Sequence, residues 1–353
     1  MRQKSGKKQN TLLDIAVVAG VAPMTVSRVV NQNGYVSDET REKVLQVVKE
    51  MNYRRNGLAR NLKRQMTETI GLVLGDISNP YSTEVAHAVR QAAKARGYNV
   101  LICISEHSAE EDIAAFETLE NHGVDGIIVA TRSNESGDDW LQEIVANGVP
   151  VVVIGRDFVN DVVDSISADN LRGGFEATQH LIDLGHERIA FIGAYLDDKT
   201  KLKRLQGYLK ALESHKIEID ERLVTGLKQS SESSSSYSTE KVGYECMKRL
   251  LSLPKPPTSV FARNDFTAIG AMSAIKEMNL RIPQDVAIIG FDDIPLAIHT
   301  SPPLSTIRQP MKLQGQLAAE SLLRRIENND SPRQAHVLNC DLIVRESTVG
   351  SRK

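Results

Sequence analysis

Apolar and polar positions follow different patterns in two parts of the chain, a short helical start and a long stretch of strands and helices. At the start, apolar residues recur at helical spacing over Thr11 to Ala19, from Pro23 onward and over Ser37 to Asn52. Gly20 favours a tight turn, and Pro23 suits the first position of a helix. The pattern therefore predicts three short helices, with Ser37 as the N-cap of the third. The buried face of that helix would carry Val44, Leu45, Val47 and Val48.

Beyond residue 70, short apolar runs alternate with amphipathic helices, and this rhythm occurs twice. The alternation is typical of a parallel sheet covered by helices, so we expect two α/β halves of similar size. A helix over Met311 to Glu327 and a strand-like end over Val337 to Val344 supply closing elements. The predicted strands span residues 70–74, 99–104, 126–130, 151–154, 188–192, 259–262 and 286–291.

Length and composition indicate an ordinary globular protein. The 353 residues predict two or three domains, and 41% hydrophobic and 25% charged residues exclude a disordered chain. Cys103, Cys246 and Cys340 stand far apart without a CxxC pair, so disulfides and zinc are not expected. No run of about 18 apolar residues occurs, and no cleavage site follows the basic N-terminus. We expect a cytoplasmic protein with no membrane segment.

Charge is distributed unevenly along the chain. The total is -2, but residues 1–66 carry 13 Lys and Arg against 5 Asp and Glu, a balance of +8, whereas residues 67–353 carry -10. A basic head on an acidic body indicates a polyanionic partner for the head alone. A solvated basic tail is the alternative explanation.

The strongest functional signal runs from Ala19 to Asn31. A helix, a tight turn and a second helix would expose Met24, Thr25, Ser27 and Arg28, and a helix-turn-helix presents such a face to the major groove of DNA. Hydroxyl groups reach phosphates or bases, and arginine pairs with guanine through two hydrogen bonds. A helical hairpin packed on another element is the alternative.

These residues also carry a family resemblance. Thr11 to Ala16, the turn at Gly20, Thr25 to Asn31 and Asn52-Tyr53 resemble the DNA-binding headpiece of the lactose-repressor (LacI/GalR) family. The resemblance extends over nearly the whole chain. Matching segments of the body include Ser78-Asn79-Pro80-Tyr81, Asp125-Gly126-Ile127-Ile128, Leu184-Gly185-His186, Arg204-Leu205-Gln206-Gly207-Tyr208, Asn264-Asp265 and Gly290-Phe291-Asp292-Asp293.

The resemblance implies a fold and an organisation. The fold would be α/β, with an N-terminal three-helix helix-turn-helix headpiece and a hinge helix. Two doubly wound α/β subdomains of the periplasmic-binding-protein type would follow. The expected limits are 1–55 for the headpiece, 56–68 for the hinge helix and linker, and 69–353 for the core that binds effector and dimerises. The expected partners are pseudo-palindromic operator DNA, a small-molecule effector and a second copy of the chain.

The recognition helix departs from its relatives in ways that bear on DNA reading. Members commonly have serine where Ala22 stands, so a capping side chain is missing. Pro23 and Met24 offer no side-chain hydrogen bonds, so we expect Met24 to contact a thymine methyl and Arg28 to read a guanine. The expected DNA-binding residues of the headpiece are Thr11, Leu12, Ala22, Pro23, Met24, Thr25, Ser27, Arg28, Asn31 and Tyr53.

The basic segment after Tyr53 matches the hinge helix of the family, in which a leucine wedges into the minor groove. Leu62 holds that place, and an inserted leucine kinks DNA by unstacking a base step. A buried linker residue is the alternative role for Leu62. Arg55 replaces a usual proline, which reduces rigidity and adds a phosphate contact. We expect the hinge to be disordered without DNA and helical on it, with Asn56, Ala59, Leu62 and Lys63 contacting DNA.

The family resemblance places the effector in the cleft between the two halves, where ligands of open α/β folds bind. Arg204 matches an arginine that grips ligand oxygens, and Asp292 matches a carboxylate that accepts bonds from ligand hydroxyls. Arg156 stands where several relatives carry an aspartate, so a sugar acid or a sugar phosphate competes with a neutral sugar. A surface ion pair with Asp157 or Asp161 is the alternative role for Arg156. The expected effector-binding residues are Tyr81, Ser82, Arg156, Asp169, Arg204, Asn264 and Asp292.

Two segments, 193–200 and 235–238, faintly resemble gluconate-responsive members and point to the same effector class. The predicted function is therefore a nucleoid-associated transcriptional regulator, a repressor released by an inducing sugar, sugar acid or sugar phosphate; corepressor control is the alternative. An enzyme is disfavoured because no Walker loop, GxGxxG, GxSxG or metal-spaced His/Cys cluster occurs, and no cofactor is expected. A sugar-transport receptor is disfavoured by the headpiece.

Overall fold

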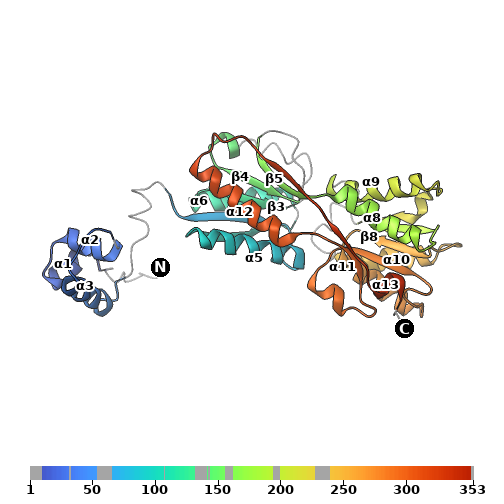
Figure 1. The fold of residues 1–353 in the computed structure, drawn as a ribbon, viewed down its shortest axis with the longest axis horizontal. Coiled ribbons are helices and arrows are strands. Elements are labelled where there is room, and N and C mark those ends of the chain that lie inside the picture. Colours follow the sequence, from blue (N-terminus) through green and yellow to red (C-terminus); the bar gives the residue numbers. More distant parts are fainter. Residues whose placement is uncertain are drawn as a thin grey trace, which may run out of the picture. The chain divides into compact units, whose positions relative to one another are not determined.

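The computed structural model describes residues 10–31, 33–53, 66–106, 108–131, 141, 144–155, 162–193, 199–226 and 239–350. The chain divides into two compact units, Met1–Gln65 and Met66–Lys353 (Figure 1).

The first unit contains the three predicted helices, α1 (Leu12–Ala19), α2 (Pro23–Asn31) and α3 (Asp38–Glu50). Thr11 begins α1 with a capping box, because its Oγ1 accepts from Asp14 N at 3.3 Å while its own N donates to Asp14 Oδ2 at 2.7 Å. Gly20 ends α1 with φ 62°, a left-handed conformation that favours glycine. The three helices bury one apolar core of Ile15, Ala16, Ala19, Val26, Val29, Val30, Val44 and Val47.

Of the expectations about α3, the burial of Leu45 was wrong and the N-cap at Ser37 was confirmed. Leu45 is 49% exposed, since it lies on the opposite side of the helix from the buried Val44 and Val47. Ser37 holds the N-cap position but makes no side-chain bond to the helix backbone. Its Oγ donates instead to Thr40 Oγ1 at 2.9 Å.

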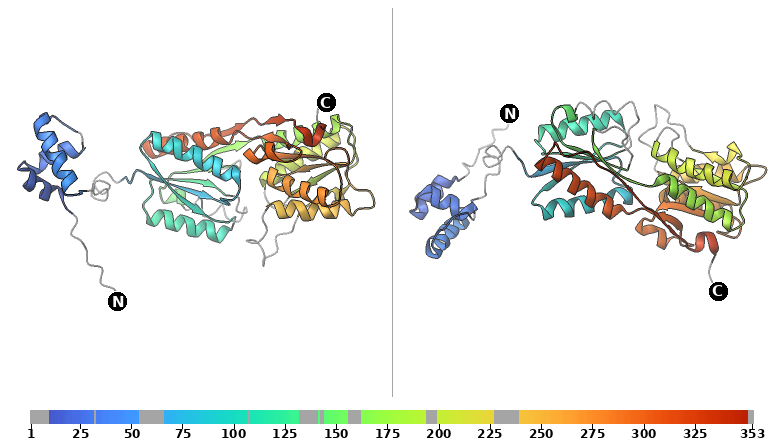
Figure 2. Two further views of the ribbon diagram at one scale, coloured as in Figure 1. Left: turned by 90° about the horizontal axis from the view of Figure 1, so that it is seen from below. Right: turned by 45° about the horizontal axis from the view of Figure 1, so that its top comes forward.

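The second unit contains two α/β subdomains, as predicted, each built on a six-stranded sheet of described residues. In the first subdomain all strands are parallel, in the order β11-β5-β4-β3-β1-β2. Helices α5 and α12 cover one face of this sheet and α6 covers the other (Figures 1 and 2). The elements are β1 (Thr69–Leu74), α5 (Pro80–Ala95), β2 (Asn99–Ile104), α6 (Ala109–Asn121), β3 (Ile127–Ala130), β4 (Val151–Ile154), β5 (Asp164–Ala168), α12 (Met311–Glu327) and β11 (Ala335–Leu338).

The second subdomain has the strand order β12-β10-β9-β8-β6-β7, in which β12 alone runs antiparallel to its neighbour. Helices α8 and α9 cover one face, and α10 and α11 cover the other. The elements are α8 (Asn170–Asp183), β6 (Ile189–Ile192), α9 (Lys199–Ser214), η2 (Glu221–Leu223), β7 (Val224–Thr225), α10 (Thr239–Leu251), β8 (Ser259–Ala262), α11 (Asp265–Glu277), β9 (Ala287–Asp292), η3 (Pro295–His299), β10 (Ser305–Arg308), β12 (Asp341–Ile343) and α13 (Glu346–Val349).

Glycines let the paired helices of the second subdomain approach closely. A Cβ on Gly243 of α10 would lie 1.9 Å from the carbonyl oxygen of Thr267, and a Cβ on Gly270 of α11 would lie 1.8 Å from that of Glu240. Neither distance is compatible with a side chain, so the α10–α11 contact requires glycine at both positions.

The chain crosses between the subdomains three times, after β5, after β10 and after β11. Each crossing begins at the carboxyl end of a parallel strand, so the carboxyl edges of the two sheets face each other across the crossings (Figure 2). Asp169 N donates to Leu338 O at 2.8 Å and joins the first crossing to the third. This topology brings strand ends and helix N-termini of both subdomains together at the place where the sequence predicts the effector cleft.

Two predicted features of this region need correction. The strand-like end over residues 337–344 is two strands, β11 and β12, that belong to different sheets. The chain must cross between subdomains at Cys340, which is buried, and it cannot continue straight there. Strands β5 and β10 were not predicted, because buried polar residues such as Asp164 and Ser305 interrupt their apolar pattern.

Within the described residues, no single helix is long and apolar enough to span a membrane; α1 and α2 pass that test only together, across a bend of 109°. The three cysteines are free thiols, and burial raises the pKa of Cys340 to about 12.

Candidate DNA-binding surface and effector cleft

The recognition helix α2 has one apolar face and one solvent face. Val26, Val29 and Val30 are buried in the core of the first unit, which turns Met24 and Arg28 outward. Met24 is 66% exposed, so its side chain is accessible to a partner surface. Ala22, Pro23 and Asn31 are also exposed, whereas Thr25 and Ser27 are half-buried at the edge of the same face.

Local contacts hold this face in shape. Ala22 begins α2 through its carbonyl oxygen, which accepts from Thr25 N at 2.8 Å and from Val26 N at 3.2 Å, so the missing capping side chain leaves the carbonyl to start the helix. Asn31 Nδ2 donates to Ser27 Oγ at 3.1 Å, which leaves the Ser27 hydroxyl hydrogen available to an external acceptor.

The other predicted DNA-binding residues lie in different places. Thr11 is exposed at the start of α1, while Leu12 and Tyr53 are half-buried against the core of the first unit. Asn56, Ala59, Leu62 and Lys63 lie outside the described residues, as does Arg55.

Arg204 lies at the centre of the second subdomain's wall of the cleft. Its side chain is buried, its Nε donates to Asn170 Oδ1 at 2.8 Å, and its Nη1 donates to Arg263 O. The guanidinium carbon lies 3.7 Å from the centroid of the Phe291 ring, and Nη2 lies 3.7 Å from Asp292 Oδ1. These contacts fix the plane of the guanidinium group and hold it beside a carboxylate, an arrangement suited to ligand hydroxyls.

Asp292 is held in an unusual backbone conformation at the carboxyl end of β9. Its φ is 120°, a region that favours glycine, and its side chain is 1% exposed. Gln309, which lies in the crossing to α12, donates through Nε2 to Asp292 Oδ1 at 2.5 Å. Strain of this kind at a strand end is common where a side chain must point into a binding site.

A second buried carboxyl group lies close by. Asp265 is fully buried, and it accepts from Thr306 Oγ1 at 2.6 Å and from Ile294 N at 2.9 Å. Burial, followed by the charge of Asp292, raises the pKa of Asp265 well above its ordinary value.

The remaining predicted residues of the cleft line both subdomains. Asn264 follows β8 and caps α11, where its Oδ1 accepts from Thr267 N at 2.9 Å. Asp169 caps α8 through Arg172 N at 3.0 Å and is half-buried. In the first subdomain, Tyr81 and Ser82 lie in the first turn of α5 and are buried. Arg156 lies outside the described residues.

Sequence reasoning missed three polar residues that contact the predicted ones: Asn170 beside Arg204, Gln309 beside Asp292, and Gln314 of α12. Tyr81 Oη donates to Gln314 Oε1 at 3.1 Å, although 233 positions separate the two residues. The local sequence pattern does not reveal contacts between residues so far apart. The local sign of Gln314 is that a glutamine stands at a buried position of α12.

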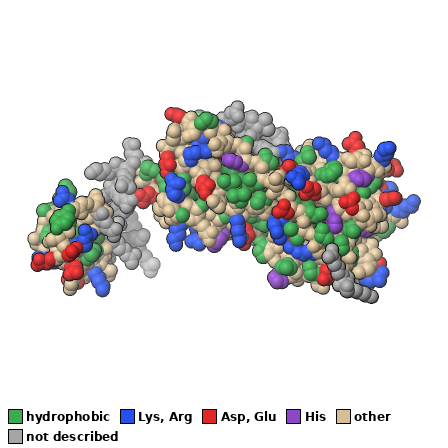
Figure 3. Space-filling view, in the orientation of Figure 1, with side chains coloured by type: hydrophobic (Ala, Val, Ile, Leu, Met, Phe, Trp, Pro, Cys, Tyr) green, Lys and Arg blue, Asp and Glu red, His purple; other side chains and the backbone are tan. Residues whose placement is uncertain are grey.

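On the face drawn in Figure 3, basic and acidic side chains are intermixed over the second unit, without a field of one sign. Among the described residues, no group of three or more His, Cys, Asp or Glu side chains is arranged to hold a metal ion.

A helix-turn-helix unit joined to a two-subdomain unit with a polar cleft defines a ligand-controlled DNA-binding protein.

Comparison with known proteins agrees with this class. Residues 11–56 match the family described as bacterial regulatory proteins, lacI family, and residues 178–348 match the periplasmic binding protein-like domain. The ribose operon repressor of Haemophilus influenzae is 38% identical over 96% of this chain and 98% of its own length. The HTH-type transcriptional repressor PurR of Mannheimia succiniciproducens is 35% identical with the same coverage.

The structure also superposes on the lac repressor dimer bound to operator and the anti-inducer ONPF. The TM-score is 0.84 and the identity 28%, over 97% of this chain and 99% of that one. The chain belongs to the LacI family of bacterial regulatory proteins. It is a DNA-binding transcriptional regulator whose second unit binds a small-molecule effector, as the sequence predicted.

Proposed function

We propose that the protein is a cytoplasmic, nucleoid-associated homodimeric repressor that binds a pseudo-palindromic operator and responds to a carbohydrate-type effector. The observation that carries this proposal is that one chain has both an exposed recognition face on α2 and a buried pair, Arg204 and Asp292, at the predicted effector site. A symmetric dimer reads two half-sites related by its own two-fold axis. The similar lac repressor is a dimer on its operator, which supports this assembly.

The recognition helix reads the operator through two side chains one turn apart. Arg28 pairs with a guanine, and Met24 contacts a thymine methyl group, because methionine offers no hydrogen-bonding hydrogen. Thr11, Thr25, Ser27, Asn31 and Tyr53 contact the phosphate backbone, and Leu62 wedges into the minor groove with Asn56, Ala59 and Lys63 beside it. The limits 1–55, 56–68 and 69–353 divide headpiece, hinge and core.

A selection of binding sites from random DNA tests this readout. Wild type should yield an inverted repeat with one guanine per half-site, and Arg28→Ala should lose that guanine preference, at a cost of about 1 to 3 kcal/mol. Arg41→Ala, which removes a cation from α3, should weaken binding on all sequences alike. If both variants retain the same consensus, Arg28 contributes charge only and the readout is refuted.

The effector occupies the cleft with Arg204 and Asp292 on one wall and Tyr81 and Ser82 on the other. An arginine donates to sugar hydroxyl oxygens, and a neighbouring carboxylate accepts from sugar hydroxyl groups, so the pair suits a sugar. The ribose operon repressor is among the relatives, which supports a sugar or a sugar derivative. If Arg156 contacts the effector together with Asp169 and Asn264, as the sequence predicts, the same class extends to sugar acids and sugar phosphates.

The effector acts as an inducer in this proposal, and corepression is the alternative.

The relatives are transcriptional regulators, and the described residues of the cleft do not include a nucleophile paired with a general base, so we assign no enzymatic activity. A thermal-shift screen tests the effector class: a ligand at 100 times its dissociation constant adds about 2.7 kcal/mol of stability. A screen in which only non-carbohydrate compounds stabilise the protein would refute that class.

A further inference from the structure

Gln314 is a buried polar residue on a mostly apolar face of α12. The neighbouring buried residues of α12 include Met311, Ala318, Leu322 and Leu323, yet Gln314 is 0% exposed among them. A leucine in this position would satisfy the packing without a polar group. A buried amide without its hydrogen bonds destabilises a fold, so its presence requires an explanation outside stability.

The two ends of the Gln314 amide are in different states. Its Oε1 accepts from Tyr81 Oη at 3.1 Å, so the acceptor end is satisfied. Its Nε2 is buried and has no hydrogen-bond partner among the described residues. The amide therefore keeps two hydrogens for an acceptor that this part of the chain does not supply.

The position of this amide is the carboxyl edge of the first sheet. Tyr81 follows the loop after β1, and its Oη lies 3.6 Å from where a Cβ on Gly155 would stand, just after β4. Gln314 itself lies one turn into α12, directly after the crossing from β10. Both observations put the unpartnered amide at the cleft edge.

A second amide in the same state lies on the other subdomain. Asn264 is 1% exposed at the carboxyl end of β8, its Oδ1 is used by Thr267 N, and its Nδ2 has no hydrogen-bond partner in the structure. Each wall of the cleft thus has one buried amide whose acceptor end is occupied and whose donor end is not.

We propose that Gln314 is a specificity-determining residue, and that the effector presents an oxygen acceptor to Gln314 on one subdomain and a second to Asn264 on the other. This inference rests on the proposed function, because it assigns the chemistry of the same effector. The acceptor at Gln314 is a carboxylate or phosphoryl oxygen or a hydroxyl oxygen, and all three share the lone pairs that the amide needs. A ligand held in this way links the two subdomains directly.

The test measures binding of three probes, D-ribose, D-gluconate and D-ribose 5-phosphate, by calorimetry on the full-length protein. Gln314→Met keeps length and apolar packing but removes the amide, and Asn264→Asp keeps the helix cap but removes the Nδ2 hydrogens. Each variant should bind the recognised probe about tenfold more weakly, the loss expected for one hydrogen bond. The melting temperature of Gln314→Met without ligand should equal or exceed that of wild type, which a purely structural role does not predict.

Gln314→Glu identifies the acceptor, with Gln316→Glu on the exposed side of α12 as the charge-matched control. A carboxylate at 314 repels the anionic group of D-gluconate or D-ribose 5-phosphate but accepts from a hydroxyl of D-ribose. If Gln314→Glu loses affinity for an anionic probe only, the acceptor is the anionic group. If Gln314→Glu still binds D-ribose, the acceptor is a hydroxyl oxygen. Either result supports the proposal. Unchanged affinity in both Gln314→Met and Asn264→Asp overturns it. If no probe binds wild type, the proposed carbohydrate effector itself is refuted, and the inference falls with it.

Discussion

Replacing Arg325 with methionine removes the cation of a fully buried ion pair in the first subdomain. Arg325 and Asp164 are both 0% exposed, and Arg325 donates to the two Asp164 oxygens through Nε at 2.7 Å and Nη2 at 3.1 Å. Arg325 also donates to the carbonyl oxygens of Asn329, Ser331 and Pro332, while Gln334 N donates to Asp164 Oδ1 at 2.5 Å. The pair therefore joins the start of β5, the end of α12 and the start of β11.

The cost of the substitution follows from what it leaves behind. Removing one partner of a buried ion pair costs about 3 to 5 kcal/mol, because the other charge stays buried without compensation. Here three carbonyl oxygens lose a donor as well, so we expect the upper half of that range. Arg324→Met is the matched control on the adjacent position, since Arg324 Nη2 lies 3.3 Å from Asp164 and its side chain is 33% exposed. Its loss should cost about 1 kcal/mol or less.

The pH dependence gives a second signature. Burial alone would raise the pKa of Asp164, but hydrogen bonds from Arg325 and Gln334 and the charges of Arg325 and Arg324 lower it below its ordinary value. In wild type this carboxylate thus stabilises the fold above the unfolded pKa of about 4, and that contribution is lost as pH falls through the folded pKa. In Arg325→Met burial dominates, so the deficit should be largest near neutral pH and shrink toward about pH 4.

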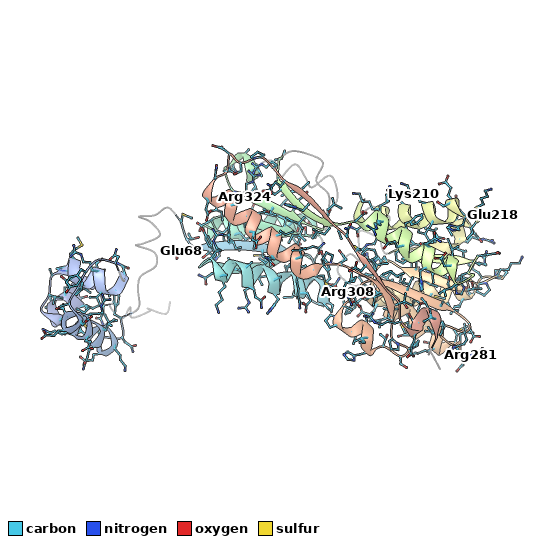
Figure 4. All side chains as sticks on the ribbon, viewed as in Figure 1. Glu68, Lys210, Glu218, Arg281, Arg308 and Arg324 are labelled. Carbon is cyan, nitrogen blue, oxygen red and sulfur yellow. The ribbon has the colours of Figure 1, made fainter. Side chains whose placement is uncertain are left out.

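Native-state hydrogen exchange at amides of β5 and β11 measures the opening free energy of this sheet rather than of the whole chain. The pair lies at the end of α12 remote from the crossing: Arg308 marks the crossing at one end of α12, and Arg324, next to Arg325 in the chain, lies near the other end (Figure 4). Operator binding of the folded variant should be unchanged. Equal effects of Arg325→Met and Arg324→Met, or a deficit independent of pH, would refute the reasoning.

Three further predictions concern other parts of the chain. Gly270→Ala should destabilise the second subdomain by at least about 1 to 3 kcal/mol in urea unfolding, because its Cβ would stand 1.8 Å from Glu240 O, whereas Ser273→Ala on the exposed side should be near neutral. Thr11→Ala removes the capping box of α1 and should lower headpiece stability by about 1 kcal/mol in a thermal melt; no change would show that the cap is dispensable. Burial lowers the pKa of His180, so its stabilising contribution holds above an unfolded pKa of about 6.5 and falls as pH drops below it; His180→Gln should flatten the stability profile there.

Strands and helices with a regular apolar pattern could be predicted from the sequence, because the spacing of their apolar residues along the chain shows which side chains are buried. β2, β4, β8 and α12 have the predicted limits. β5 and β10 could not be predicted in this way. Ser305 in β10 is buried through bonds with Arg345 and Thr348, some forty residues away, as Asp164 in β5 is buried through Arg325.

The residues of the candidate site also fall into two groups, those that a local motif marks and those that only long-range contacts reveal. Arg204, Asn264 and Asp292 could be proposed from short motifs, since each stands at a strand end or in a helix that a motif marks. Gln309 and Gln314 could not be proposed from the sequence, because only their contacts with Asp292 and Tyr81 in the folded chain place them at the site. Residues of the hinge and Arg156 keep the status of predictions, because they lie outside the described residues.

The central claim is that effector and operator binding are coupled through one chain. Fluorescence anisotropy of the selected operator, titrated with and without the carbohydrate that stabilises the protein, measures this coupling directly. We predict that the ligand changes operator affinity about 5- to 150-fold, and that operator DNA changes ligand affinity by the same factor, as thermodynamic linkage requires. A ligand that binds the cleft tightly and leaves operator affinity unchanged would contradict the account.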